Sequence, residues 1–332
     1  CECENGYYWW GHETGCTNKL SLGNICTGQT KCYNNKPKTN ITCPTLSTAD
    51  FYGQDAQYAA LGLCTPKSLI IRTISSQKVV EDLNTGLIWQ QTNPTDTYTW
   101  ESAKTYCEDL VYAGSSDWRL PTPQEFLTIV QINNSYVIDT TKFPNMSRGR
   151  GFWTLKEDIQ DSGNLITSYS YAFETSFGEI RAGLKTGTAM VMCVSGKELP
   201  KSTFKKEKVN DEIVVKDLAT GLIWQKTYER QKTWQEALSY CENLEYAGYD
   251  DWRLPNKNEL ASLADFDVVG LPFSNFPDIP HSYFWTSSSA PWDYVDYDFS
   301  VAFEVSFSLY YIADNVGDGK ATPHYVKCVR SE

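Results

Sequence analysis

The stretch VVEDLNTGLIWQ at residues 79–90 returns almost unchanged as VVKDLATGLIWQ at residues 214–225. TWESAKTYCEDLVYAGSSDWRLP at 99–121 is matched in the same way by TWQEALSYCENLEYAGYDDWRLP at 233–255. Because the offset stays near 130–135 residues, one domain of about 120 residues is duplicated. The predicted organisation is a cysteine-rich head at 1–66, a first domain at 79–196, a charged linker at 197–213 and a second domain at 214–332.

Local patterns predict the same elements in both copies. The alternating, β-branched stretch VVxDLxTGLIWQ predicts a strand, a tight Thr-Gly turn and a second strand. Thr99 and Thr233 are expected to cap a first helix, and Thr122 and Asn256 a second one that follows DWRLP. The remainder of each copy predicts strands and long loops. The fold class is therefore α+β.

The composition of the chain limits the classes of partner that it is expected to bind. Of the 332 residues, 41 are acidic and 29 are Lys or Arg, so the formal net charge is −12. Nucleic-acid binding is not expected, because it needs a clustered basic surface. No apolar run is long enough for a transmembrane segment.

Eleven cysteines indicate an oxidising compartment. One cysteine of each copy lies in the first helix and one in the last strand, with equal spacing. This predicts the disulfides Cys107–Cys193 and Cys241–Cys328.

The head holds seven cysteines, an odd number. Cys1 is either the lipidated N-terminus of a bacterial lipoprotein, which would give a lipid anchor, or a truncation point. The pairing among the other six is left open. They are Cys3, Cys16, Cys26, Cys32, Cys43 and Cys64.

The ordered set TGLIWQ, TW, YC, AG, DWRLP, FWT and a final C-V-R resembles the DUF1566 family, also called the Lcl C-terminal domain family, over about 79–196 and 214–332. The resemblance implies two tandem C-type-lectin-like domains, related to the formylglycine-generating-enzyme fold, in which two helices flank a twisted antiparallel sheet with long loops. It also implies ligand binding and adhesion at a bacterial surface. The acidic chain departs from the sulfated-polysaccharide binding known in the family, whereas glycan binding in general remains an expectation.

Residues present in only one copy are the candidates for ligand binding, because a scaffold repeats what it needs to fold. Aromatic and acidic side chains together suit a sugar, and the acids could instead hold calcium or simply be solvated. In the second copy these residues are Trp292, Asp293, Tyr294, Asp296, Tyr297 and Asp298, and in the first they are Arg148, Arg150 and Lys156. The repeated Trp and Arg of DWRLP are expected to serve packing, with the Arg bonded to Asp or backbone.

Catalysis has little support in the sequence. The three histidines are dispersed and no hydrolase, haem or nucleotide motif is present. The domain cysteines are expected in bridges, so no catalytic residue and no cofactor other than calcium is expected. The sequence predicts a non-enzymatic recognition or adhesion protein, extracellular or on a bacterial cell surface, that binds a glycan or surface protein. The alternative is a structural subunit that self-assembles into a filament or surface layer.

Overall fold

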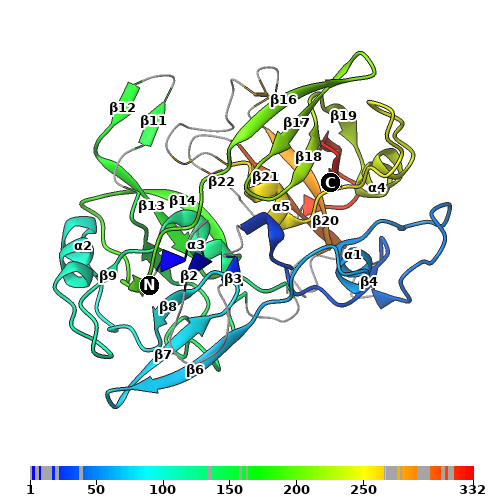
Figure 1. Cartoon of the computed structure of the whole chain (residues 1–332). Coiled ribbons are helices and arrows are strands. Elements are labelled where there is room, and N and C mark those ends of the chain that lie inside the picture. Colours follow the sequence, from blue (N-terminus) through cyan, green and yellow to red (C-terminus); the bar gives the residue numbers. More distant parts are fainter. Residues whose placement is uncertain are drawn as a thin grey trace.

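The computed structural model describes residues 2, 3, 7, 8, 17, 18, 22–36, 40–132, 137–156, 159–161, 164–264, 266, 275, 276, 279, 280, 282–289, 300–307, 311, 312 and 318–332. The fold is α+β, mostly sheet with few and short helices, as predicted. Two similar domains lie side by side, and the short helices α3 (Pro123–Thr128) and α5 (Lys257–Ala261) lie near the centre (Figure 1).

The first domain contains two larger sheets and a hairpin. Their strand orders are β6-β7-β8-β15-β9, β10-β13-β14-β22 and β11-β12, with β22 contributed by the second domain. The elements are β6 (Leu69–Ile74), β7 (Gln77–Asp82), β8 (Leu87–Gln90), α2 (Trp100–Glu108), β9 (Trp118–Arg119), α3 (Pro123–Thr128), β10 (Gly151–Trp153), β11 (Ile159–Asp161), β12 (Asn164–Ile166), β13 (Tyr169–Glu174), β14 (Glu179–Leu184) and β15 (Val194–Ser195).

The second domain repeats this plan. Its sheets have the orders β16-β17-β18-β25 and β19-β24-β20-β21-β23. The elements are β16 (Phe204–Val209), β17 (Glu212–Asp217), β18 (Leu222–Gln225), β19 (Glu229–Lys232), α4 (Trp234–Glu242), α5 (Lys257–Ala261), β20 (Tyr283–Ser289), β21 (Val301–Ser306), β22 (Tyr311–Ile312), β23 (Asp318–Gly319), β24 (His324–Val326) and β25 (Val329–Ser331).

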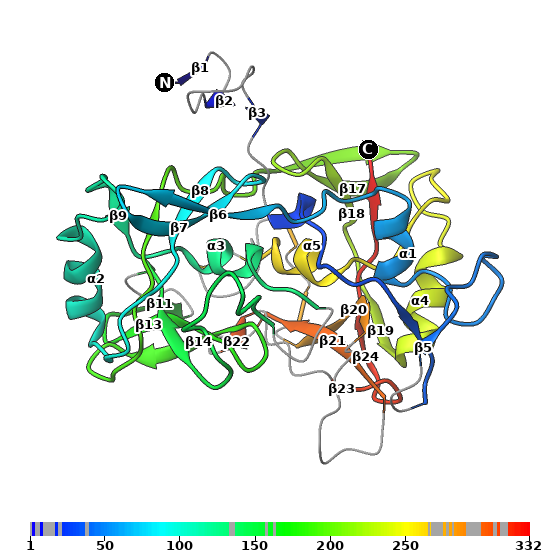
Figure 2. The same ribbon diagram turned by 90° about the horizontal axis from the view of Figure 1, so that it is seen from below.

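The head is built from short elements. They are β1 (Glu2–Cys3), β2 (Tyr7–Tyr8), β3 (Thr17–Asn18), the 3-10 helix η1 (Leu22–Asn24), β4 (Cys32–Tyr33), β5 (Asn40–Ile41) and α1 (Asp55–Ala60). Helix α1 lies against the second domain, near α4, in two perpendicular views (Figure 2). No helix among the described residues is both long and apolar enough to cross a membrane.

The predicted turns and helix starts are confirmed. Gly86 and Gly221 occupy the turn before β8 and β18 with φ of 70° and 75°, which glycine adopts without strain. The second helix of each domain begins with a capping box, in which the side chain of Thr122 or Asn256 accepts from the backbone N–H three residues later, that of Glu125 or Glu259.

The structure differs from the prediction between the domains. Residues 204–209 of the expected linker form β16, which pairs with β17 from Phe204↔Asp217 to Val209↔Glu212. Strand β6 pairs with β7 in the same way in the first domain. The repeated unit therefore begins ten residues before the similarity in sequence does. The lysine-rich sequence resembled a linker because an edge strand can keep charged side chains in solvent.

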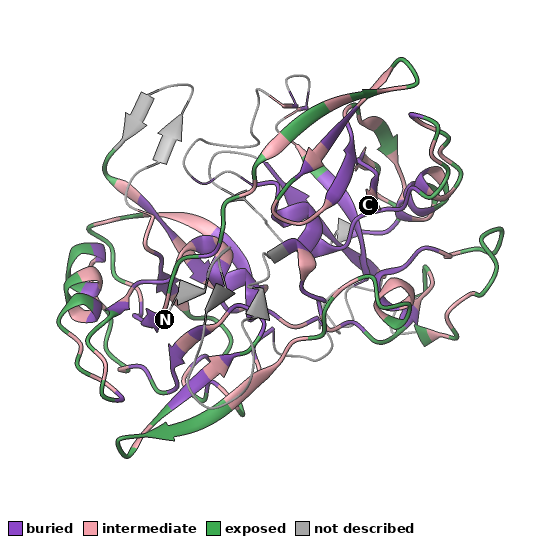
Figure 3. Cartoon of the chain, viewed as in Figure 1, coloured by how far each residue is buried: buried purple, intermediate pink, exposed green. Residues whose placement is uncertain are grey.

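The two domains share one hydrophobic cluster, and each also has a smaller buried cluster of its own around its disulfide. Phe126, Phe152 and Phe173 from the first domain belong to the same buried cluster as Trp224 and Leu260 from the second. Strand β22 of the second domain also pairs with β14 of the first, with Ile180 opposite Ile312. Figure 3 shows buried ribbon in the interior of both domains. The domains are therefore packed as one body rather than joined by a hinge.

Four disulfides link described cysteines. Cys107 pairs with Cys193 and Cys241 with Cys328, the pairing that equal spacing predicted. In the head, Cys26 pairs with Cys64 and Cys32 with Cys43. Cys1, Cys16 and the side chain of Cys3 lie outside the described residues.

Candidate functional site

The DWRLP arginines are structural. Arg119 donates two parallel hydrogen bonds to the Glu125 carboxylate, at 2.8 and 2.7 Å. Arg253 does the same to Glu259, at 2.7 and 2.6 Å. The carboxylate partner is thus the glutamate of the capping box and not the aspartate of DWRLP. The expected backbone bonds are present for Arg119, which also donates to Leu120 O and Gly196 O, each at 3.1 Å. A guanidinium engaged in this way fixes the start of the second helix and is not available to a ligand.

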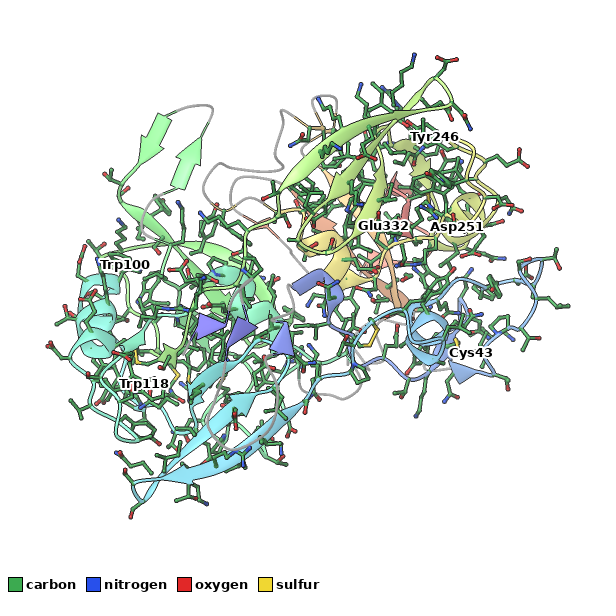
Figure 4. The ribbon with its side chains drawn as sticks, in the orientation of Figure 1. Cys43, Trp100, Trp118, Tyr246, Asp251 and Glu332 are labelled. Carbon is green, nitrogen blue, oxygen red and sulfur yellow. A yellow bond between two sulfur atoms is a disulfide. The ribbon has the colours of Figure 1, made fainter. Side chains whose placement is uncertain are left out.

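The repeated tryptophans are buried, as expected for packing. Trp89, Trp224, Trp100 and Trp234 are fully buried. The Nε1 of Trp100 donates to Thr154 O at 2.9 Å, and that of Trp234 to Thr286 O at 2.8 Å. Figure 4 places Trp100 at helix α2, within the first domain.

The predicted binding residues of the first copy separate into two places. Arg148 and Arg150 are exposed and precede β10. The Arg148 guanidinium lies 5.7 Å from the centre of the Phe177 ring, and the backbone of Arg150 bonds to Thr175. Lys156 follows β10 at its other end and is half-buried, and its carbonyl accepts from the Ser170 hydroxyl. Only the two arginines therefore share one surface.

The structure does not place the residues that were predicted to bind a ligand in the second copy. Trp292, Asp293, Tyr294, Asp296, Tyr297 and Asp298 lie outside the described residues. Among the residues that the structure does describe, no three His, Cys, Asp or Glu side chains are grouped as a metal site. Calcium therefore stays an untested expectation of the sequence.

A surface that the sequence did not reveal lies under the head. Phe51 stacks on Trp234, with 6.3 Å between the ring centres, and Tyr58 lies 5.1 Å from the Arg253 guanidinium. The Tyr58 hydroxyl also donates to Glu242. The side chain of Gln235 donates to the Asp50 carboxylate of the head at 2.9 Å. On the first domain the counterparts of Gln235 and Glu242 are Glu101 and Glu108, and both are exposed. The head thus covers on one domain a face that the other leaves open.

Polar groups of the head are buried in the same interface. The Asp55 carboxylate accepts from the Thr27 hydroxyl at 2.5 Å and from the Ser288 hydroxyl at 2.6 Å. Burial raises the pKa of Asp55 to about 6. The side chain of Asn258 donates to Ile25 O at 2.8 Å. The head is therefore attached to the second domain through a specific polar network as well as through aromatic contacts.

Buried lysines join other parts of the molecule. Lys257 Nζ donates to Gly178 O of the first domain at 3.2 Å, and burial lowers the pKa of this lysine well below its ordinary value. Lys320 Nζ donates to Asn34 O of the head at 2.9 Å and lies 3.9 Å from the centre of the Trp234 ring. A neutral amine can act as a nucleophile, but both side chains are enclosed, at 1% and 2% exposure. They hold segments together rather than meet a substrate.

Comparison with known proteins gives one positive result. A model of the Lcl C-terminal domain matches residues 78–195 and 213–330, which together are more than half of the chain. No curated protein matches the chain.

Proposed function

Since this chain belongs to the Lcl C-terminal domain family through both of its repeats, we propose that it is an exported surface-recognition protein without catalytic activity. Its two domains, which we propose to be C-type-lectin-like, bind a glycan or another surface component through their loops. The four disulfides between described cysteines support export, because such bridges persist in oxidising compartments. They also support a non-enzymatic role, because bridged sulfurs cannot act as nucleophiles.

The exposed arginine pair beside Phe177 carries the proposal of ligand binding. The second domain has Pro280 and Ser282 at the positions of Arg148 and Arg150, so the arginines are not needed by the scaffold. Guanidinium groups donate paired hydrogen bonds to hydroxyl or carboxylate oxygens of a sugar. The Phe177 ring, over which the Arg148 guanidinium lies, adds an aromatic group to this surface.

Glycan-array binding of the intact chain tests the proposal. Replacement of both Arg148 and Arg150 by Ala is expected to weaken binding to the glycans that the unmodified chain captures by at least about tenfold. Replacement of Lys205 and Lys206 by Ala removes the same charge from the exposed strand β16 and serves as the matched control. Equal loss in the control, or no glycan captured by the unmodified chain, would overturn the assignment of this site.

The segment 290–299, which lies outside the described residues, is the second candidate and needs its own variant. Replacement of Trp292 and Asp293 by Ala removes one aromatic and one acidic side chain from it. If only this variant loses binding, the ligand belongs to the second domain. The function would then stand and the arginine site would not.

A further inference from the structure

Strand β6 forms an open edge of its sheet. It pairs with β7, and no other described strand lies on its far side. The Leu83 N–H donates to Ser68 O at 2.9 Å, and in an antiparallel pair such bonds recur at each second residue. Ile70, Arg72 and Ile74 therefore bond to β7, whereas the backbone groups of Leu69, Ile71 and Thr73 face outward.

This edge is apolar and exposed. Its sequence is LIIRTI, and Ile71 and Ile74 are 41% and 39% exposed. Figure 3 shows the hairpin projecting from the body with an exposed outer strand. Soluble proteins normally block such edges with charge, because unpaired N–H and C=O groups are a template for another strand.

The second domain has that protection at the equivalent place. Strand β16 has the sequence FKKEKV, so Lys206 and Lys208 stand where β6 has Ile71 and Thr73. The outward-facing positions are thus charged in one copy and uncharged in the other. Fold requirements cannot explain the difference, because both strands make the same six-residue pairing with their hairpin partner.

We infer that β6 is a dimerisation edge at which two copies of this chain pair antiparallel about a twofold axis. Pairing centred on Ile70 sets Ile70 against Ile70 and Leu69 against Ile71, and it satisfies the outward backbone groups of both strands. A twofold contact of this kind closes on itself and gives a dimer rather than a filament. The inference does not depend on the proposed ligand binding.

The distribution of charge supports a second copy of this chain as the partner of strand β6. The whole chain carries −12, so most of its surface repels another copy. Residues 69–82 of the β6–β7 hairpin contain two basic and two acidic residues and have no net charge. The Arg72 charge is balanced by Glu81, whose carboxylate lies 2.6 Å from the guanidinium. In contrast, two β16 strands would set lysine against lysine.

Sedimentation velocity of the full chain between about 1 and about 100 µM tests the inference. A concentration-dependent dimer is expected. The variant Ile71→Lys/Thr73→Lys, which copies the lysines of β16, is expected to dimerise at least about tenfold more weakly. The variant Lys206→Ala is the control and is expected to dimerise normally.

Hydrogen exchange of the unmodified chain gives a readout that does not depend on how the variants fold. Amides of 69–74 are expected to gain protection as concentration rises, while those of 204–209 do not change. A monomer throughout this range, a dimer with unaltered exchange at 69–74, or open polymers would each overturn the inference.

Discussion

Arg119 and Arg253 hold the same position in the two domains but differ in exposure. The Arg253 side chain is 5% exposed and that of Glu259 is 2%, whereas the Arg119 side chain is 19% exposed. A buried charge that loses its partner cannot be solvated, so its cost grows with burial. The same sequence motif therefore has two electrostatic environments, because Tyr58 of the head lies over the Arg253 guanidinium.

Replacing the glutamate partner of each arginine tests whether burial determines the cost of losing the ion pair. Glu259→Gln leaves a buried guanidinium without a counter-charge and is expected to lower the free energy of unfolding by about 3 kcal/mol. Glu125→Gln is expected to cost less, because water reaches Arg119. Urea unfolding followed by tryptophan fluorescence measures both. Glu207→Gln, whose partner Lys205 is exposed, is the control and should cause no measurable change. Equal losses in the two glutamate variants would contradict the role of burial.

At the scale of elements, the contribution of helix α1 of the head to stability depends on whether Asp55 is ionised. The folded protein raises the pKa of this carboxyl from 3.8 to about 6, so it holds the proton more tightly than the unfolded chain. Stability from this group is full below pH 3.8 and is lost as pH rises through about 6. The charged neighbours are Glu259, which raises the pKa, and Arg253, which lowers it.

Asp55→Asn tests this dependence, because the amide keeps the shape and an oxygen acceptor but does not ionise. The difference in unfolding free energy, unmodified protein minus variant, is expected to fall as pH rises from about 4 to about 7. Thermal unfolding in a pH series measures it. A constant difference across that range would show that Asp55 does not titrate within it.

How far the sequence predicts the elements depends on where their partners lie. The strands around Gly86 and the capping boxes of Thr122 and Asn256 are local, so short patterns predict them. The pairing of Phe51 with Trp234 joins residues far apart in the chain and repeats nowhere, so no pattern signals it. Strand β16 was mistaken for a linker because its pairing with β17, not its composition, makes it a strand.

The residues of the candidate site could also be predicted from the sequence only in part. Comparison of the two copies picks out Arg148 and Arg150, which the structure leaves exposed on one surface. The same comparison grouped Lys156 with them, but Lys156 lies at the other end of β10. The sequence alone does not show which of these side chains the folded chain brings onto one surface. The open face of the first domain could not be predicted, since it depends on what the head covers on the second.

At the scale of the whole molecule, the shared core couples the two domains. Phe126 and Trp224 belong to one buried cluster, and β14 pairs with β22 across the domain boundary. Damage to either domain should therefore destabilise both. If the separate clusters around the two disulfides determined stability instead, the domains would unfold separately.

Removing one disulfide at a time tests this coupling. Cys107→Ser/Cys193→Ser and Cys241→Ser/Cys328→Ser are each expected to cost about 2–5 kcal/mol, since each bridge closes a loop of similar length. Calorimetry should show a single transition at lower temperature in both variants. The unmodified protein under the same non-reducing conditions is the reference. A second transition that stays at its original temperature would mean that the domains unfold independently.

The two domain bridges also determine how the chain would respond to mechanical tension. They close segments of 86 and 87 residues between the first helix and the last strand of each domain. A covalently closed segment cannot be drawn out when the ends of the chain are pulled, even after its strands separate. About 600 Å of chain contour is thereby withheld from extension. Under tension only the chain outside these two segments could extend, and within each bridged domain the load would pass through a covalent bond instead of sheet hydrogen bonds.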